Sequence, residues 1–150
     1  MDIRLATIND IDAITEMERQ CFPPEEAAEK DSFEKRLTVF PNHFWLLEDS
    51  GKIVSMINGM TTNIPILRDE MFEDATMHME DGQWQMIFGV ATLPAYQKMG
   101  CASKLMEHVL FHFMRNLVIL MKESPCQNMG EPCGMICGWC LKNYREKELI

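Results

Sequence analysis

Basic residues and long apolar segments are both scarce in this sequence. Lysine and arginine together number 14 against 23 aspartates and glutamates, so the formal net charge is −9 at pH 7. Such a charge disfavours nucleic acid or an anionic membrane as the main partner. The longest apolar stretch, around residues 109–121, is broken by His112, Arg115 and Asn116 and is too short to span a bilayer. We therefore expect no membrane segment.

A secretion signal is also missing from the N-terminus, because MDIRLATINDID has no basic region followed by an apolar one. We therefore expect a cytoplasmic protein. In that reducing compartment the six cysteines are not expected to form a disulfide framework. The 150 residues suffice for one domain with a sizeable core, and neither a repeat nor a second domain is evident.

The hydrophobic pattern predicts a mixed α/β domain. Helices are expected at residues 11–21, near 33–40 and after Gly100, and strands at residues 3–8, 43–48, 53–62, 85–92 and 117–121. The element order is then β-α-α-β-β-β-α-β, followed by an irregular or incomplete C-terminus. Asn9 is expected to cap the first helix. Gly59 and Gly89 mark candidate β-bulges within their strands.

The segment GVATLPAYQKMGCASKLMEHVL, residues 89–110, places a short loop between a strand and a helix. The first N–H groups of a helix lack partners within the helix, and they bind anions with the help of the helix dipole. Gly100 lets the backbone approach a phosphate, Ala102 is small, and Lys98 can add a charge-assisted contact. The same spacing also occurs in ordinary strand–helix turns, and it matches neither a Walker loop nor GxGxxG.

Residues 97–102, QKMGCA, resemble the Q/R-x-x-G-x-G/A signature of the GNAT superfamily of acetyl-CoA-dependent N-acetyltransferases. The preceding VATLPAYQ, with Pro94 and Tyr96, and the element order are similar to that family as well. MERQCFPPEEAA and QWQMIFGVATLP resemble its arylalkylamine and polyamine branch. The resemblance implies a GNAT-like fold, with a mixed, mostly antiparallel central sheet flanked by helices.

The resemblance also implies a binding site for acetyl-CoA as co-substrate. Its pyrophosphate would be bound by a loop that comprises Gln97, Lys98, Met99, Gly100, Cys101, Ala102 and Ser103. The pantetheine arm would pair like an added β-strand with the main chain at Phe88, Val90 and Thr92. In this family the fourth strand is bulged and splayed from the fifth, and Gly89 lies where such a bulge is expected.

The implied reaction is direct attack of a primary amine on the thioester, so a base must accept the proton of the amine. Vertebrate-type members of the arylalkylamine branch carry two histidines on the fourth strand, but Met86 and Phe88 occupy the matching positions. Other members use a glutamate after the first helix. This makes Glu26 the candidate base and Glu25 the alternative, unless both are simply solvated.

The residues beside those glutamates, Phe22, Pro23 and Pro24, either line a pocket for an aromatic amine or end the first helix with the phenylalanine packed inward. His78 is a further candidate base. The four-residue spacing of His108 and His112 suits a metal, but no partner ligands are evident in the sequence. No metal is therefore expected.

The tail, residues 122–150, departs from the family, and the expected motif close to YYxKxGF is absent. Three interpretations are open. The tail is a divergent segment that still pairs as strands, or a zinc site formed by Cys126, Cys133, Cys137 and Cys140, or the product of a frameshift or truncated gene. We favour the last. Two functions remain open. One is an N-acetyltransferase acting on a small-molecule amine. The other is a weakly active CoA-binding remnant that completes its sheet by forming a homodimer through an exposed edge.

Overall fold

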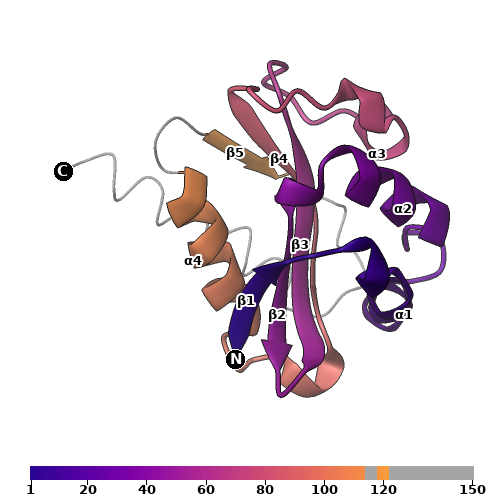
Figure 1. Cartoon of the computed structure of the whole chain (residues 1–150), viewed down its shortest axis with the longest axis vertical. Coiled ribbons are helices and arrows are strands. Elements are labelled where there is room, and N and C mark those ends of the chain that lie inside the picture. Colours follow the sequence, from indigo (N-terminus) through magenta and orange to yellow (C-terminus); the bar gives the residue numbers. More distant parts are fainter. Residues whose placement is uncertain (114–117, 122–150) are drawn as a thin grey trace.

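Figure 1 shows the computed structural model of the chain, which describes residues 1–113 and 118–121. Its strands form one sheet in the order β1-β2-β3-β4-β5. They are β1 (Asp2–Leu5), β2 (Phe44–Asp49), β3 (Lys52–Thr62), β4 (Trp84–Thr92) and β5 (Val118–Met121). The pairs from β1 to β4 are antiparallel, and β4 and β5 are parallel. The expected mixed, mostly antiparallel sheet is confirmed.

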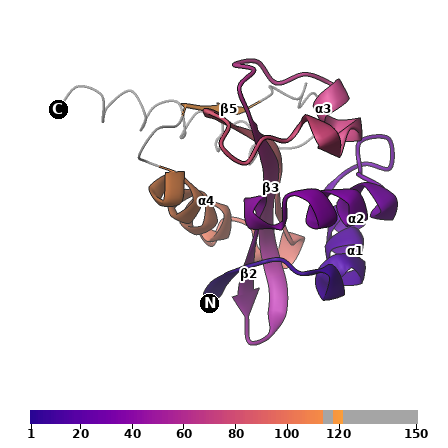
Figure 2. The same ribbon diagram turned by 45° about the horizontal axis from the view of Figure 1, so that its top comes forward.

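Helices cover both faces of the sheet (Figures 1 and 2). On one face lie α1 (Ile11–Cys21) and α2 (Lys30–Val39), and on the other lies α4 (Cys101–Phe113). The core under α1 and α2 includes Ile14, Met17, Phe33, Leu37, Leu46 and Met56. The core under α4 includes Trp45, Ile57, Ile87, Leu105, Met106 and Val109. Each helix thus buries one apolar stripe, as its spacing predicts.

The first turn after β1 differs from the prediction. Asn9 does not cap a helix; a 3₁₀ turn at Ile8–Asp10 begins instead at Thr7, whose N–H donates to the Asp10 carboxylate at 2.7 Å. Arg4 explains the difference, because its guanidinium donates two hydrogen bonds to Asp10 and two to Glu48. The bonds from Arg4 lower the pKa of Asp10 to about 2. This ion-pair network draws the turn toward β1, which ends at Leu5 rather than at residue 8.

A β-bulge interrupts the pairing of β3 with β4. Asn58 pairs with Gly89, but the next residue, Gly59, pairs with Ile87, so Phe88 is the extra residue in β4. A Cβ at Gly59 would lie 1.7 Å from the carbonyl oxygen of Met86. Only glycine therefore lets the two backbones approach this closely. The bulge expected at Gly89 lies one residue earlier in β4.

The connection from β3 to β4 contains the short helix α3 (Glu70–Glu73) and a 3₁₀ turn at Ala75–Met77.

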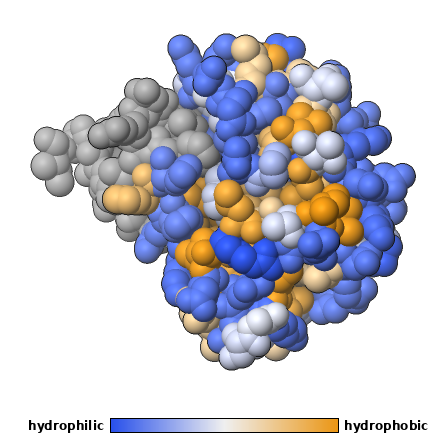
Figure 3. Space-filling view, viewed as in Figure 1, coloured by the Kyte–Doolittle hydropathy of each residue, from blue (hydrophilic) through white to orange (hydrophobic). Residues whose placement is uncertain are grey.

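Figure 3 shows apolar side chains near the middle of one face of the molecule, surrounded by hydrophilic ones. In the part of the chain that the structure describes, no helix is long and apolar enough to cross a membrane. The tail, with its three interpretations, lies outside the described residues.

Replacing Gly59 should destabilise the fold because of this close approach. We expect Gly59→Ala to lower the free energy of unfolding by at least about 3 kcal/mol, since the new methyl group must displace backbone. Gly89→Ala is the matched control: its Cβ would meet only the Asn58 amide, at 3.7 Å, and should cost less than about 1 kcal/mol. Urea unfolding measures both, and equal losses would contradict a special role for Gly59.

Candidate functional site

The loop expected to bind the pyrophosphate joins β4 to α4. A 3₁₀ turn at Pro94–Tyr96 follows β4, and α4 begins at Cys101. Lys98 and Gly100 adopt positive φ angles of 63° and 79°. A Cβ on Gly100 would meet no atom within 4 Å. The backbone at Gly100 therefore faces open space, as a loop that receives a ligand must.

The N-terminus of α4 supplies backbone donors beside this open space. The N–H of Lys104 donates to the Gly100 carbonyl at 2.9 Å and makes the first helical bond. The N–H groups of residues 101–103 precede that bond, so they are the donors that a helix of this length offers to an anion. Cys101 contributes only backbone, because its side chain is buried under α4. Met99 is exposed.

The side chain of Gln97 anchors the loop to β4. Its side-chain amide donates to the carbonyl oxygen of Thr92 at 3.3 Å, which ties the loop to the end of β4. The signature glutamine thus holds the loop in place through its side chain. The exposed Lys98, next to it, is the charged side chain of this loop.

Among residues 1–113 and 118–121, the second half of β4 has a free edge on the side away from β3, because the described part of β5 pairs only with Trp84 to Ile87. Residues 89–92 pair with β3, and Phe88 is the extra residue of the bulge. An extended chain with amide groups, such as a pantetheine arm, can add to such an edge through the main chain. Phe88, Val90 and Thr92, the residues predicted to pair with the pantetheine arm, all lie on this segment.

The turn that carries Glu25 and Glu26 lies near the same end of β4. The thiol of Cys21, at the end of α1, contacts the Thr92 carbonyl oxygen at 3.4 Å. The Glu26 N–H donates to the Pro23 carbonyl at 3.0 Å and closes the turn, and both carboxylates are exposed. The turn therefore places two acidic groups in solvent, four and five residues after Cys21, which contacts the end of β4.

The neighbours of those glutamates differ in burial. Phe22 is half-buried and packs against the core under α1 and α2, so the inward packing that was one of its two interpretations is observed. Pro23 is half-buried and Pro24 is exposed. His78 lies near His43 at the opposite end of β4, where Gln85 contacts the His43 ring at 2.7 Å.

Sequence reasoning missed a buried cation beside the bulge. Arg36 on α2 is 6% exposed, and its guanidinium carbon lies 5.0 Å from the ring centre of Phe88. Its Nη1 donates to the Asn58 side chain at 3.0 Å and its Nη2 to the Phe72 carbonyl at 3.1 Å. Its Nε has no acceptor among the described residues. Burial lowers the pKa of Arg36 to about 10, so the group remains charged at neutral pH.

A buried acid accompanies this cation. Glu18 on α1 is 8% exposed, and its carboxylate accepts the N–H of Ala28 at 3.1 Å. Burial raises the pKa of Glu18.

A signal for Arg36 was present in the sequence, because it lies three residues after Phe33 and one before Leu37, on the buried stripe of α2.

The sequence matches the Acetyltransferase (GNAT) family over residues 11–134. The chain belongs to the GNAT acetyltransferase family. The match includes residues 122–134, the first part of the divergent tail. A search of curated proteins found no match.

Solved structures of GNAT-like proteins share the fold. The GphF GNAT-like decarboxylase, solved in complex with isobutyryl-CoA, is 28% identical with a TM-score of 0.68, over 74% of this chain and 58% of that one. The loading GNATL domain of CurA from Lyngbya majuscula is 20% identical with a TM-score of 0.71, over 79% and 63%. This chain therefore spans less than two thirds of either protein.

The similarity also extends to an acetyltransferase whose match reaches nearly the whole chain. Diaminobutyrate acetyltransferase EctA from Paenibacillus lautus, in complex with its substrate and coenzyme A, is 15% identical with a TM-score of 0.67. That match covers 99% of this chain and 76% of EctA. At this identity the likeness concerns the fold alone.

Gly100→Val tests whether the open loop binds CoA. We expect its Kd for CoA to rise at least roughly 100-fold, because a valine side chain fills the space for phosphate and prevents the close approach. Gly51→Val is the matched control: Gly51 also has a φ of 81° and open space beside it, but it lies in the β2–β3 turn. It should bear similar backbone strain and still bind CoA. Calorimetry measures both, and unchanged affinity in Gly100→Val would refute the site.

Proposed function

We propose that this member of the GNAT family is an N-acetyltransferase that transfers acetyl from acetyl-CoA to a primary amine. One observation carries the proposal. The open turn at Gly100, the N-terminus of α4 and the free edge of residues 88–92 are continuous along the chain. They suit the pyrophosphate and the pantetheine arm of one acyl-CoA molecule, in that order.

The chain then supplies backbone donors and a base. The neutral amine attacks the thioester carbonyl carbon, so the new C–N bond forms as the C–S bond breaks and CoA leaves as a thiolate that takes a proton. A free backbone N–H on the β4 edge is suited to stabilise the oxyanion that develops. Glu26, or else Glu25, accepts the proton that the amine loses. Both carboxylates lie in the turn that follows α1, and the last residue of α1 contacts the end of β4.

We place the amine in the arylalkylamine or polyamine class. Two observations support this assignment. The chain carries a net charge of −9, which attracts a cationic amine over a distance. The exposed turn adds two carboxylates beside the apolar rings of Pro23 and Pro24, and Phe22, which packs inward, adds only its exposed part. An aromatic or aliphatic amine meets both features there.

Decarboxylation of a carboxyacyl-CoA is a second candidate function. It is favoured by the 28% identity to GphF, described as a GNAT-like decarboxylase. It is also favoured by Arg36, whose buried guanidinium lies against Phe88 and whose Nε has no acceptor among the described residues. Such a cation can bind an acyl carboxylate. In malonyl-CoA, cleavage of the C–C bond would release CO₂, and a proton would then convert the remaining carbanion to acetyl-CoA.

A thiol-release assay separates these functions. With acetyl-CoA and a panel of tryptamine, phenethylamine and spermidine, we expect CoA thiol to appear with at least one amine, together with the acetylated product by mass spectrometry. Conversion of malonyl-CoA to acetyl-CoA without thiol release would instead support decarboxylation. If neither acetyl-CoA with an amine nor malonyl-CoA is turned over, but CoA raises the Tm, the protein is the CoA-binding remnant. Light scattering would then detect its homodimer.

The candidate base is tested in the same assay. We expect Glu26→Gln to lower kcat at least roughly 100-fold and to leave the KM for acetyl-CoA unchanged, because a glutamine cannot accept the proton. Glu25→Gln should stay within a few-fold of the unchanged protein, as should Glu34→Gln, an exposed residue of α2. If kcat falls in Glu25→Gln instead, Glu25 is the base. If kcat falls in neither variant, the turn that carries Glu25 and Glu26 does not supply the base.

A further inference from the structure

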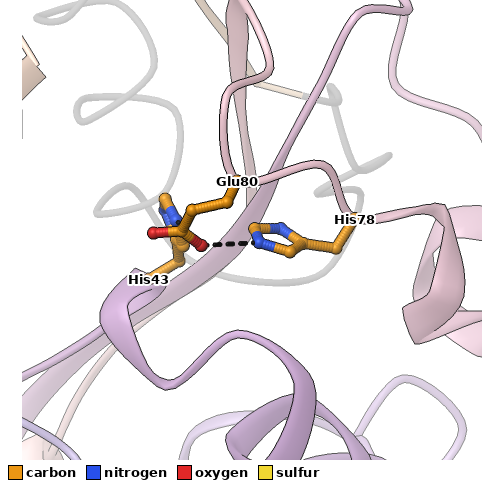
Figure 4. Close-up of side chains that lie close together, drawn as sticks. All are labelled: His43, His78 and Glu80. Atoms are coloured by element: carbon orange, nitrogen blue, oxygen red, sulfur yellow. Dashed lines mark hydrogen bonds and ion pairs between the residues drawn. The ribbon is translucent and has the colours of Figure 1, made fainter.

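Three side chains that can bind a metal meet at the end of β4 opposite the CoA loop (Figure 4). His43 ends the 3₁₀ turn before β2, and His78 and Glu80 lie in the connection from β3 to β4. The Glu80 Oε2 lies 2.9 Å from His78 Nε2 and 3.4 Å from His43 Nε2. One ligand atom from each residue lies within 4.8 Å of the others.

The orientation of His43 is fixed by Gln85. The Gln85 amide nitrogen donates to the carbonyl oxygens of Met60 and Met86, at 3.2 and 2.9 Å. Its oxygen therefore faces His43 Nδ1, at 2.7 Å. Since an amide oxygen only accepts, Nδ1 carries the proton and Nε2 directs its lone pair to the side of Glu80. Histidine ligands in metal sites have this arrangement, with the second nitrogen held by a hydrogen bond.

The second nitrogen of His78 is also supported, by Thr61. The Thr61 N–H donates to His78 Nδ1 at 3.3 Å, so Nε2 donates its proton to Glu80. The Thr61 hydroxyl lies 3.5 Å from the same Nδ1 and donates to the Met79 carbonyl. If a cation replaces the proton on Nε2, Nδ1 takes that proton, gives up the bond from the Thr61 N–H and donates to the Thr61 hydroxyl oxygen instead. Neutral imidazole is then kept throughout.

We propose that His43, His78 and Glu80 form a binding site for a divalent transition metal, with zinc the best match. Two imidazoles and one carboxylate are donors that zinc prefers, and a site with three protein ligands keeps a fourth position open. Donors about 2.0–2.2 Å from zinc lie roughly 3.3 Å apart in a tetrahedron. The two separations from Glu80 Oε2, 2.9 and 3.4 Å, are close to this spacing.

Burial and shape give the metal a route to the site. The side chains of His43 and His78 are 4% and 6% exposed, whereas that of Glu80 is 59% exposed. Asn42 donates to Glu80 at 3.4 Å and supports it from the side. Glu80 also lines a hollow of about 440 Å³ together with Trp45 and His108. A cation can therefore enter past Glu80 and bind the two buried imidazoles, with its fourth position toward solvent.

The site is separate from the proposed acetyl-CoA site, so it does not depend on the proposed function. Its ligands come from two segments: the β3–β4 connection and the 3₁₀ turn just before β2. No metal was expected from the sequence, because no partner ligands are evident for His108 and His112. Spacing along the chain does not bring residue 43 together with residues 78 and 80. Only the path of the connection places them side by side.

Zinc titration of the full chain tests the proposal. After dialysis against EDTA, we expect one Zn²⁺ to bind at this site with a Kd of 10 µM or less, which is about 7 kcal/mol. Glu80→Gln and His78→Ala should each weaken binding at least roughly 100-fold, because loss of a ligand should cost at least as much as loss of its supporting hydrogen bond. Glu73→Gln removes an exposed carboxylate from α3, in the same connection, and should bind as the unchanged chain does.

Two further measurements distinguish zinc at this site from zinc bound by the cysteines or bound nonspecifically. Co²⁺ bound by nitrogen and oxygen shows weak visible bands, whereas binding by the cysteines adds intense near-ultraviolet bands that persist in Glu80→Gln. Zinc should raise the Tm of the unchanged chain and of Glu73→Gln, but not that of Glu80→Gln, whose exposed side chain leaves the metal-free Tm nearly unchanged. Zinc binding that is absent, or unaffected by Glu80→Gln and His78→Ala, would overturn the proposal.

Discussion

The close approach of β3 and β4 at Gly59 is the constraint on which the candidate acyl-CoA site depends. With a Cβ excluded there by the Met86 carbonyl, the two backbones meet and β4 gains one residue, Phe88. Pairing of β4 with β5 ends at the residue before that bulge. In the part of the chain that the structure describes, the bulge therefore separates the half of β4 that pairs with β5 from a half that pairs with β3 only, and the loop to α4 continues from this second half.

The same bulge positions charge. Phe88 lies over the guanidinium of Arg36, and Asn58, at the register shift, accepts a hydrogen bond from it. Glu18 favours the charged form of Arg36 from α1. A buried cation with incomplete hydrogen bonding costs stability unless a ligand or a partner compensates it. In both proposed reactions the acyl-CoA would lie beside Phe88, where a substrate carboxylate or carbonyl oxygen would complete the hydrogen bonding of Arg36.

Local patterns predicted the elements and the turn before α4 well. Each successful prediction depends on a short-range requirement. The apolar stripes of α1 and α4 follow from packing, the hairpin turn before Lys52 from turn geometry, and Gly100 from a positive φ angle. Sites made by distant residues were not predictable in this way. Arg36 meets Phe88, and His43 meets Glu80, only because the sheet brings remote segments together. The cap at Thr7 was missed for the same reason, since Arg4 and Glu48 determine where Asp10 lies.

The order of the strands also bears on how the chain folds. Each described strand pairs with its neighbours in sequence, so no strand has to be inserted between two that already pair. β2 and β3 are joined by a turn of two residues, Ser50 and Gly51, whereas longer segments precede β2 and follow β3. Closing a short loop costs less entropy than closing a long one. We therefore expect this hairpin to form first, so that β4 acquires its bulge against a template that is already folded.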